Sequence, residues 1–298
     1  MTTNQDQFGR EFMFTDGEFQ RICQLIHDHA GIALTASKKD MVYTRLVRRL
    51  RARKLTSFAD YLAVLDRRDK PEWEAFVNAL TTNLTAFFRE PHHFKALARH
   101  IAKIQQRRPI DLWCSAASTG EEAYSIAMTV ADVFGTHTPP VRILASDIDT
   151  EVLKKAAAGI YGREQLEKLP TGMLNRYFNP LKYDKGEDQF QVRQELRDLI
   201  VFRQINLLDD YWPIRAPFEA IFCRNVMIYF DKATQHRILK KFVPLMRRDG
   251  LLFAGHSEHL QHAVELFHLE GETIYTVAEK SLPLAAPIAG HNRPLLPR

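Results

Sequence analysis

The chain has 298 residues, 45% of them hydrophobic and 26% charged, which is the composition of a folded protein with one or two domains. The sequence has no apolar run of the roughly 18 residues that a membrane-spanning helix needs, and its start lacks the features of a secretory signal. Its three cysteines are too scattered for a disulfide framework. We therefore expect a cytoplasmic protein with no direct membrane insertion. The net charge of +5 suits an acidic partner without identifying one.

Residues 15–82 predict a domain of four short helices, after a disordered or loosely ordered start over 1–14. Thr15 and Glu18 have the spacing of a capping box that begins the first helix. The second helix is apolar on one face, and its basic residues gather opposite: Lys38, Arg45, Arg48 and Arg49, with Arg51 at the edge. Such a face is either solvated or a docking surface, and the pattern alone leaves both open.

From residue 93 to about 280, apolar strand-like runs alternate with helical stretches. This alternation predicts an α/β domain, with a mostly parallel sheet and helices on both faces. Over about 160–205 the alternation breaks, and a polar–apolar pattern predicts a small antiparallel β insertion rather than another βα unit. Residues 281–298 contain four prolines and predict a disordered tail.

Three of the expected strands end in polar residues, at the edge where open α/β sheets bind ligands. The first runs into a small-residue loop with one glycine and then two acids, which favours a neutral or cationic ligand over a pyrophosphate. An ordinary tight turn with an acidic helix cap is the alternative. The second strand ends in Asp147, which can accept ribose hydroxyls while Asp149 caps the next helix; the alternative is that either acid is simply a helix cap. The third delivers Arg224 and Asn225, which need partners if they are buried.

Four strings in this sequence are long and specific: TTNLTAFFRE at 81–90, ASTGEE at 117–122, ASDIDTEVL at 145–153 and FCRNVMIYF at 222–230. With them the chain closely resembles the bacterial chemotaxis receptor methyltransferases, from about residue 12 to residue 280. The resemblance implies a Rossmann-like sheet that binds S-adenosylmethionine and releases S-adenosylhomocysteine. It also implies methyl esterification of receptor glutamates to 5-O-methyl esters, a reaction of sensory adaptation.

The resemblance implies which residues contact the cofactor, and all of them except Asn206 and Leu207 lie in those strings. They are Asn83, Thr85, Arg89, Glu122, Asp147, Asn206, Leu207, Arg224 and Asn225. Glu122 matches the position at the methionyl end, Asp147 the position at the ribose, and Asn206 with Leu207 the position beside the adenine. The linker over 83–92 would then close over the cofactor from the helical side.

The proposed reaction needs placement of its reactants more than acid–base chemistry. A glutamate with a pKa near 4.3 is already ionised at neutral pH, so no general base is required. We expect Tyr229 and Arg89 to orient the incoming carboxylate. An arginine that pairs too tightly would stabilise the ground-state anion, so Tyr229 is the preferred positioning group and Arg89 serves cofactor and substrate together.

The resemblance also assigns two surfaces to the receptor. Arg45, Arg48, Arg49 and Arg51 would dock against its glutamate-bearing cytoplasmic helices and recruit the protein to the membrane. Gln191, Val192 and Arg193 would lie where the receptor's C-terminal peptide adds as a strand on an exposed edge. An edge strand can equally be blunted by its own charges and bind nothing. We expect the protein to be a monomer.

Two other functions and a metal site compete with this interpretation. A base-amine methyltransferase usually carries Asn/Asp-Pro-Pro-aromatic after its fourth strand, whereas this chain has Arg224-Asn225-Val226-Met227, so no nucleic-acid partner is expected. The intact cofactor positions argue against a non-catalytic scaffold. No metal is expected either, because His92 and His93 should point apart on a helix and His256 lacks a carboxylate or cysteine cluster at ligand spacing.

Overall fold

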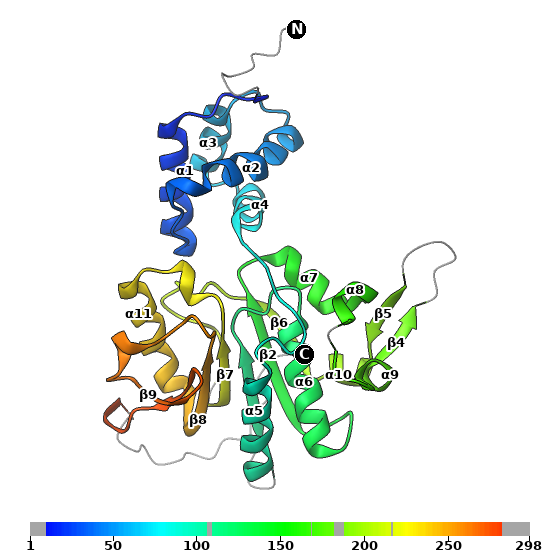
Figure 1. The fold of residues 1–298 in the computed structure, drawn as a ribbon. Coiled ribbons are helices and arrows are strands. Elements are labelled where there is room, and N and C mark those ends of the chain that lie inside the picture. The colour runs from blue at the N-terminus through cyan, green and yellow to red at the C-terminus, as the bar shows by residue number, and fades with distance from the viewer. Residues whose placement is uncertain (1–9, 106–108, 168, 182–187, 216, 282–298) are drawn as a thin grey trace.

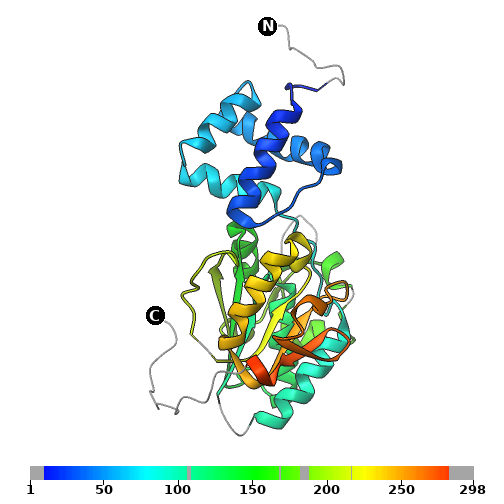
Figure 2. The ribbon, with the colours of Figure 1, turned by 90° about the vertical axis from the view of Figure 1, so that its left-hand side faces the viewer.

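The computed structural model describes residues 10–281, apart from 106–108, 168, 182–187 and 216. The expected disorder over 1–14 and 281–298 therefore falls mostly outside the described residues. A helical part stands on one end of an α/β part, as two views a quarter turn apart show (Figures 1 and 2). No described helix has the length and apolar character to cross a bilayer.

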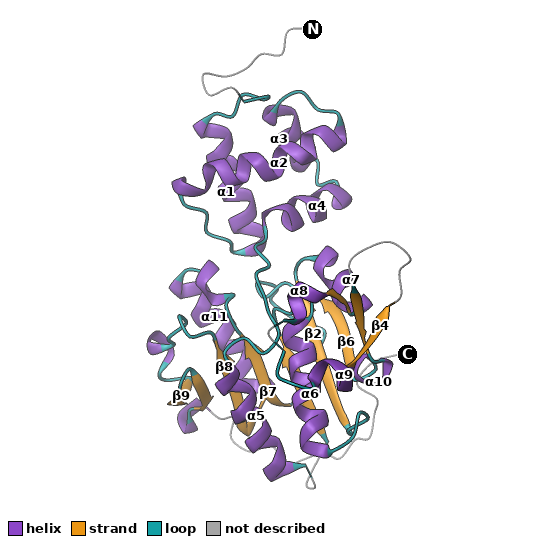
Figure 3. Cartoon of the chain, turned by 45° about the vertical axis from the view of Figure 1, so that its right-hand side comes forward, coloured by secondary structure: helices purple, strands orange, loops and turns teal. Residues whose placement is uncertain are grey.

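The helical part is a bundle around its own hydrophobic core (Figure 3). Thr15 and Glu18 form the expected capping box at its first helix, and Gly31 ends that helix with φ 70°. Leu46, Phe58 and Phe76 are fully buried where the helices meet. The helices are α1 (Asp16–Ala30), α2 (Lys39–Arg53), α3 (Phe58–Asp66) and α4 (Lys70–Leu80), with a 3₁₀ turn at Ala36–Lys38.

Seven of the described strands form the main sheet, in the order β6-β2-β1-β7-β8-β10-β9. The first five in that order run parallel, and β10 is antiparallel to both of its neighbours. The strands are β1 (Ile110–Cys114), β2 (Val141–Asp147), β6 (Ile200–Gln204), β7 (Phe218–Cys223), β8 (Met246–Ala254), β9 (Phe267–Gly271) and β10 (Ile274–Val277). The expected fold class, an α/β Rossmann-like sheet with an N-terminal helical domain and a small β insertion, is confirmed.

Apolar residues alternate across the sheet and bury both of its faces. Leu112 and Cys114 of β1 belong to one core cluster and Trp113 to the other, as the twofold period of a strand requires. The helices on the first face are α5 (Pro91–Ile104) and α6 (Glu121–Phe134), and α11 (Lys232–Phe242) covers the second. Short 3₁₀ turns lie at Met227–Tyr229, Val243–Leu245, Gln261–Ala263 and Glu279–Ser281.

The insertion is a separate antiparallel sheet in the order β3-β5-β4. Its elements are β3 (Ile160–Gly162), α8 (Arg163–Leu166), α9 (Met173–Tyr177), β4 (Phe178–Leu181), β5 (Gln189–Val192) and α10 (Gln194–Arg197), and it follows α7 (Thr150–Ala158). The predicted end near 205 is wrong, because β6 pairs parallel with β2 in the main sheet. Because β6 is an edge strand, its Arg203 and Gln204 are exposed. Its mixture of polar and apolar residues is therefore the same as in a half-exposed antiparallel strand.

The predicted exposed edge in the insertion is also corrected. Gln191 pairs with Ile160 of β3 on one side and with Asn179 of β4 on the other, so β5 is the central strand. Val192 is buried, and Arg193 lies beyond the strand, before α10. The alternation of polar and apolar residues indicates which face of a strand is buried. It does not indicate whether the strand pairs with one neighbouring strand or with two. A peptide that adds a strand to this sheet would have to pair with β3 or β4.

The strand order reverses beside β1. From β1 the chain builds outward through β2 and β6, and then returns to place β7 on the other side of β1. In open α/β sheets this reversal leaves a crevice at the carboxyl ends of the strands, where ligands bind. The crevice in this fold therefore lies between the loops that follow β1 and β7.

Candidate active site

A cavity of about 380 Å³ lies at this crevice, between the helical part and the carboxyl ends of the strands. Its volume falls in the range of small-molecule sites. The walls come from residues 30–41, from the linker over 81–89 and from the loops after β1, β2, β6 and β7. The structure brings together all the residues predicted for cofactor and carboxylate: Asn83, Thr85, Arg89, Glu122, Asp147, Asn206, Leu207, Arg224, Asn225 and Tyr229.

The loop between β1 and α6 approaches the cavity closely because it is built from small residues. Ser115, Ala116 and Ser118 line the wall. Gly120 follows with φ +100°, and a Cβ there would lie 2.8 Å from the Tyr161 hydroxyl and 2.9 Å from the Ala156 Cβ. Only glycine fits this position, because both its backbone angle and its neighbours exclude a side chain.

Asp147 ends β2 as a buried carboxylate with 8% exposure. The backbone N–H of Ser118 donates to its Oδ2 at 2.8 Å, and that of Asp149 donates to its Oδ1 at 3.0 Å. Burial raises the pKa of Asp147 to about 6 in spite of these donors. A carboxylate has about four acceptor positions, so this one retains capacity for hydroxyl groups of a ligand.

Asp149 caps α7 as the sequence predicts, through Oδ1, which accepts from the N–H of Glu151 at 2.9 Å and of Val152 at 3.2 Å. It also holds the linker, a contact that no sequence pattern indicated. Its Oδ2 accepts from Thr81 Oγ1 at 2.7 Å and from Asn83 Nδ2 at 2.8 Å. One carboxylate thus joins the start of α7 to the segment that crosses the cavity.

The expected partners of Arg224 are acids on two different elements. Nη1 donates to Glu122 Oε2 at 2.6 Å, and Nη2 lies 3.1 Å from Glu90 Oε2 and donates to the Arg89 carbonyl at 2.5 Å. The side chain of Arg224 has 0% exposure. A buried charge is tolerated when it is paired and hydrogen-bonded in this way. Arg224 therefore fixes Glu122 and the end of the linker.

Glu122 is held from both sides. Its second oxygen, Oε1, accepts from the Cys114 thiol at 3.2 Å, opposite the contact with Arg224. Burial raises the pKa of Glu122 although Arg224 opposes this, and burial raises the pKa of the Cys114 thiol as well. The carboxylate is an oriented acid on the cavity wall, next to the start of α6.

Glu90, His92 and His93 lie close enough together to share a metal ion. The rings of the two histidines are 4.2 Å apart, so the prediction that they point apart is wrong. The guanidinium of Arg224 already lies beside Glu90. Burial alone would raise the pKa of Glu90, but Arg224 and His256 lower it to about 2. A metal ion here would be repelled by that guanidinium.

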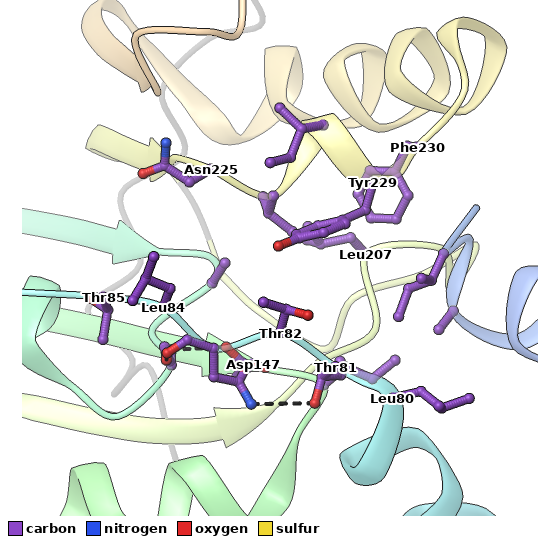
Figure 4. Close-up of a pocket in the computed structure, with 18 of the residues that line it drawn as sticks. Leu80, Thr81, Thr82, Leu84, Thr85, Asp147, Leu207, Asn225, Tyr229 and Phe230 are labelled. Carbon is purple, nitrogen blue, oxygen red and sulfur yellow. Dashed lines mark hydrogen bonds between the residues drawn. The ribbon is translucent and has the colours of Figure 1, made fainter. Parts of the chain in front are cut away.

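Arg89 and Tyr229 present groups that the protein itself leaves largely unused. Arg89 Nη1 donates to the Leu84 carbonyl at 3.0 Å, and its guanidinium forms no ion pair with the described part of the chain. The Tyr229 ring lies at the cavity, and its hydroxyl has no hydrogen-bond partner among the described residues (Figure 4). A cation and a hydroxyl donor are therefore available to an incoming anion.

Asn206 is committed to the protein rather than free at the cavity. Its Nδ2 donates to the His29 carbonyl of α1 at 2.7 Å, and its Oδ1 accepts from the Leu208 N–H at 3.0 Å. Leu207 beside it is 6% exposed. The contacts of Asn206 fix the backbone here, and Leu207 gives the wall an apolar side chain of the type that a planar ring contacts.

The four arginines predicted for docking differ in their surroundings. Arg45 Nη1 donates to the Leu80 and Thr81 carbonyls at the end of α4, at 3.2 and 2.6 Å. Arg49 pairs with buried Glu72 through two hydrogen bonds of 3.0 and 2.7 Å, and Arg51 pairs with Glu11. Arg48 is exposed and forms no hydrogen bond or ion pair within the described residues.

The helical part contributes to the cavity in a way that the sequence did not indicate. Ile32, Leu34 and Lys38 line it from the connection between α1 and α2, and Met41 lines it from the first turn of α2. The sequence pattern assigns Lys38 to the basic face of the second helix, yet it lies at the cavity. No motif marks these residues, because their position follows from how the two parts of the chain pack.

Comparison with known proteins gives the family. Residues 83–276 match the family model described as "CheR methyltransferase, SAM binding domain", and residues 17–81 match "CheR methyltransferase, all-alpha domain". The chain is 51% identical to a chemotaxis protein methyltransferase of Salmonella typhimurium, over 92% of this chain and 94% of the relative. It is 49% identical to chemotaxis protein methyltransferase 2 of Pseudomonas aeruginosa, over 93% and 99%. A third such enzyme, from Borreliella burgdorferi, is 33% identical over 88% and 94%.

These matches confirm the resemblance, the methyltransferase activity and the cofactor that the sequence strings imply. The buried acid at the end of β2, the glycine loop and the cavity volume suit a nucleoside-bearing ligand of this kind. The chain belongs to the CheR methyltransferase family and is an S-adenosylmethionine-dependent chemotaxis protein methyltransferase.

Proposed function

We propose that this enzyme esterifies glutamate side chains of chemotaxis receptors and so serves sensory adaptation. The observation that carries the proposal is that Arg89, with no ion pair among the described residues, and the Tyr229 hydroxyl, with no hydrogen-bond partner among them, share one cavity with the predicted cofactor residues. That arrangement suits an anionic substrate delivered beside the methyl donor. It has no obvious use for a neutral base amine.

The residues that would hold the cofactor follow from their geometry. Asp147 would accept the ribose hydroxyls, since its carboxylate faces the cavity with acceptor capacity left. Glu122 would face the methionyl end, and Leu207 would pack against the adenine. Arg224 and Asn206 line the cavity as expected, and their side chains also bind Glu122 and the His29 carbonyl of α1. They support the walls that the cofactor would contact.

S-adenosylmethionine supplies an electrophilic methyl group on a positively charged sulfur. The residues of the chain then have to align a carboxylate and exclude water, because the carboxylate is already an ionised nucleophile. Neither histidine nor cysteine occurs among the described residues that line the cavity. An esterification of an ionised carboxylate needs no such base.

Tyr229 and Arg89 would divide the handling of the carboxylate. The Tyr229 hydroxyl would donate one hydrogen bond and so fix the direction of attack. Arg89 would attract the anion with the donors that its contact to the Leu84 carbonyl leaves available, and we expect an attraction rather than a tight clamp. A weaker cationic contact stabilises the ground-state anion less, which keeps it reactive.

The receptor would reach the cavity from the basic side of α2. Arg48 is the arginine that we assign to docking on acidic receptor helices, since Arg45, Arg49 and Arg51 already have partners in the protein. A cytoplasmic enzyme would be brought to membrane receptors through this contact. A receptor C-terminal peptide that adds a strand would meet the insertion at β3 or β4, as β5 is paired on both sides.

Methyl transfer from labelled S-adenosylmethionine tests the proposal, with receptor-containing membranes and with DNA as alternative substrates. We expect label on the receptor that mild alkali releases as methanol, because esters hydrolyse there and N-methyl groups do not. Asp147→Ala serves as the inactive control. Alkali-stable label on DNA would replace the proposal with nucleic-acid methylation, and no transfer to either would contradict it.

A further inference from the structure

The segment after β7 carries Asn225 and Tyr229 to the cavity, and it has an unusual backbone. Asn225 has φ +58°, a left-handed conformation that is uncommon for a residue other than glycine. The chain then makes a 3₁₀ turn at Met227–Tyr229. Such a turn leaves backbone N–H groups without partners of their own, so something outside the segment must hold it.

Glu258 is the group that holds these N–H groups. It is 5% exposed, and it lies in the loop after β8. Its Oε2 accepts from the N–H of Asn225 at 2.7 Å, and its Oε1 accepts from that of Ile228 at 3.3 Å. Oε2 also accepts from the N–H of Gly255 at 2.6 Å.

The carboxylate of Glu258 forms no ion pair within the described residues, so its charge is met by backbone dipoles. Burial raises the pKa of Glu258, and the backbone donors oppose that effect. An anion surrounded by N–H groups is a strong and directional acceptor. The cost of burying the charge is tolerated here only because the backbone turns three donors toward it.

Gly255 allows this close approach. A Cβ at this position would lie 2.4 Å from Asn225 Nδ2, 2.8 Å from Glu258 Oε2 and 3.0 Å from the Asn225 nitrogen. The two chain segments therefore touch backbone to backbone, with the Asn225 amide packed over the glycine. Any side chain at Gly255 would have to move Asn225.

The other side of the same turn is held by its carbonyl groups. Gln235 Nε2, from α11, donates to the Met227 carbonyl at 2.8 Å and to the Phe230 carbonyl at 3.0 Å. The Ala33 N–H of the helical part donates to the Tyr229 carbonyl at 3.1 Å. The position of the Tyr229 ring in the cavity (Figure 4) thus depends on donors and acceptors that lie outside it.

We propose that Glu258, with Gly255, is a positioning residue for methyl transfer: its carboxylate holds the 225–229 turn so that Asn225 and Tyr229 keep their places in the cavity. Glu258 itself does not line the cavity. It acts through the turn, so its loss should change turnover more than substrate affinity. The turnover measurement rests on the proposed function, whereas the conformational measurement below does not.

Two variants test the proposal in the full chain. Glu258→Gln keeps the size but leaves one oxygen to accept where two accepted, and its NH₂ group would face N–H donors. Gly255→Ala leaves the carboxylate in place and displaces Asn225. For both we expect kcat on receptor membranes to fall by roughly 10-fold or more, as loss of a hydrogen bond to a charged group implies. The receptor KM should stay within about threefold, and amide hydrogen exchange over 224–230 should become faster.

Matched controls are Glu265→Gln, an exposed glutamate paired with His236, and Gly17→Ala, where a Cβ meets only Thr15 Oγ1 at 4.0 Å. Both should match the wild type. Unchanged exchange in Glu258→Gln, or faster exchange with kcat within twofold of the wild type, would overturn the inference. If the wild type transfers no methyl to receptors, the proposed substrate fails. In that case, S-adenosylhomocysteine affinity and amide hydrogen exchange of the Glu258→Gln variant test the positioning role of Glu258. Values equal to those of the wild type would overturn that role.

Discussion

Asp147 is the residue on which the charge of the cavity depends most directly. Its folded-state pKa is raised to about 6 by burial, from an ordinary value of 3.8. Ligand hydroxyls that donate to its carboxylate would stabilise the ionised form, so the bound pKa lies below the free one. Ligand affinity is then highest above about pH 6, and it falls as the pH drops through that pKa.

We expect Asp147→Asn to weaken S-adenosylhomocysteine binding by roughly 10- to 100-fold at neutral pH, since hydrogen bonds to a charged group contribute roughly 1.5–3 kcal/mol. The difference from the wild type should shrink toward about pH 5, where the wild-type carboxylate is protonated and the amide does not titrate. Calorimetric titration at several pH values measures this. Glu122 is the second acid on the wall, so Glu122→Gln is the control. If the pH dependence of affinity persists in Asp147→Asn and disappears in Glu122→Gln, then Glu122 and not Asp147 causes it.

Tyr229 offers a cleaner separation of binding from turnover, because its hydroxyl has no partner in the described protein. Tyr229→Phe removes one oxygen and no packing. We expect kcat for receptor methylation to fall by roughly 10-fold, the effect of one hydrogen bond to a charged group. The affinity for S-adenosylhomocysteine should stay within about twofold, and a large loss of that affinity would show that the hydroxyl serves the cofactor. Steady-state kinetics and calorimetry on the same preparation provide both values.

At the scale of elements, α2 combines two functions on one helix. Leu46 and Leu50 face the core of the helical part, while Arg45 and Arg49 reach across to α4. Arg49 neutralises Glu72, which is 1% exposed and would otherwise be a buried unpaired charge. These two arginines therefore stabilise the bundle, whereas Arg48 is exposed and has no partner among the described residues.

We expect Arg48→Glu to lower kcat/KM for receptor methylation by roughly fivefold or more at low ionic strength and to flatten its dependence on salt, because a charge at the edge of an interface acts mainly on association. The matched control is Arg99→Glu on α5, another exposed arginine without a partner among the described residues. Kinetics over a series of salt concentrations measures both. If Arg48→Glu and Arg99→Glu have the same effect, net charge rather than docking is responsible.

The sequence predicted elements well where periodicity and capping act locally, and less well where neighbours decide. The capping box at Thr15 and the buried strand of β7 could be predicted, because each depends on residues close in the chain. The positions of β5 and β6 could not, since strand pairing joins residues far apart. A central antiparallel strand and an edge parallel strand can carry the same alternation of polar and apolar residues.

The candidate site shows the same division. All its predicted members except Asn206 and Leu207 lie in the four strings that carry the resemblance, and the fold gathers them in one cavity. What each side chain does depends on its partners, and those come from other elements. Arg224 pairs with Glu122, Asn206 donates to the His29 carbonyl, and Glu258 lies outside every string used for the resemblance.

At the scale of the whole molecule, the helical part completes the cavity rather than standing apart from it. Three of the contacts that join it to the α/β part lie beside the cavity: Asn206 to the His29 carbonyl, the Ala33 N–H to the Tyr229 carbonyl, and Gly31 against Phe230. All of them lie at the wall formed by the loops after β6 and β7. Any change in the seating of the helical part therefore reaches the cofactor site directly.

The substitution Gly31→Ala tests whether the seating of the helical part affects the cofactor site, because the added methyl group would lie against Phe230. A Cβ would lie 2.7 Å from Phe230 Cδ1 and 3.2 Å from Leu208 Cδ1, at a residue whose φ is +70°. Gly31→Ala should lower the free energy of unfolding by roughly 1–2 kcal/mol from its left-handed backbone, and further from the clash. It should also weaken S-adenosylhomocysteine binding by roughly threefold or more, since Phe230 lines the cavity.

Gly135→Ala separates the backbone effect from the contact. Gly135 ends α6 with φ +65°, and a Cβ added there would meet no described atom within 4 Å, so this variant carries the backbone strain without a clash. We expect its free energy of unfolding to fall by a similar amount, roughly 1–2 kcal/mol. It should bind S-adenosylhomocysteine as the wild type does. Denaturant unfolding and calorimetry measure the two quantities. Equal affinities in both variants would mean that the helical part can shift without disturbing the cofactor site, and that the α/β part alone determines the affinity.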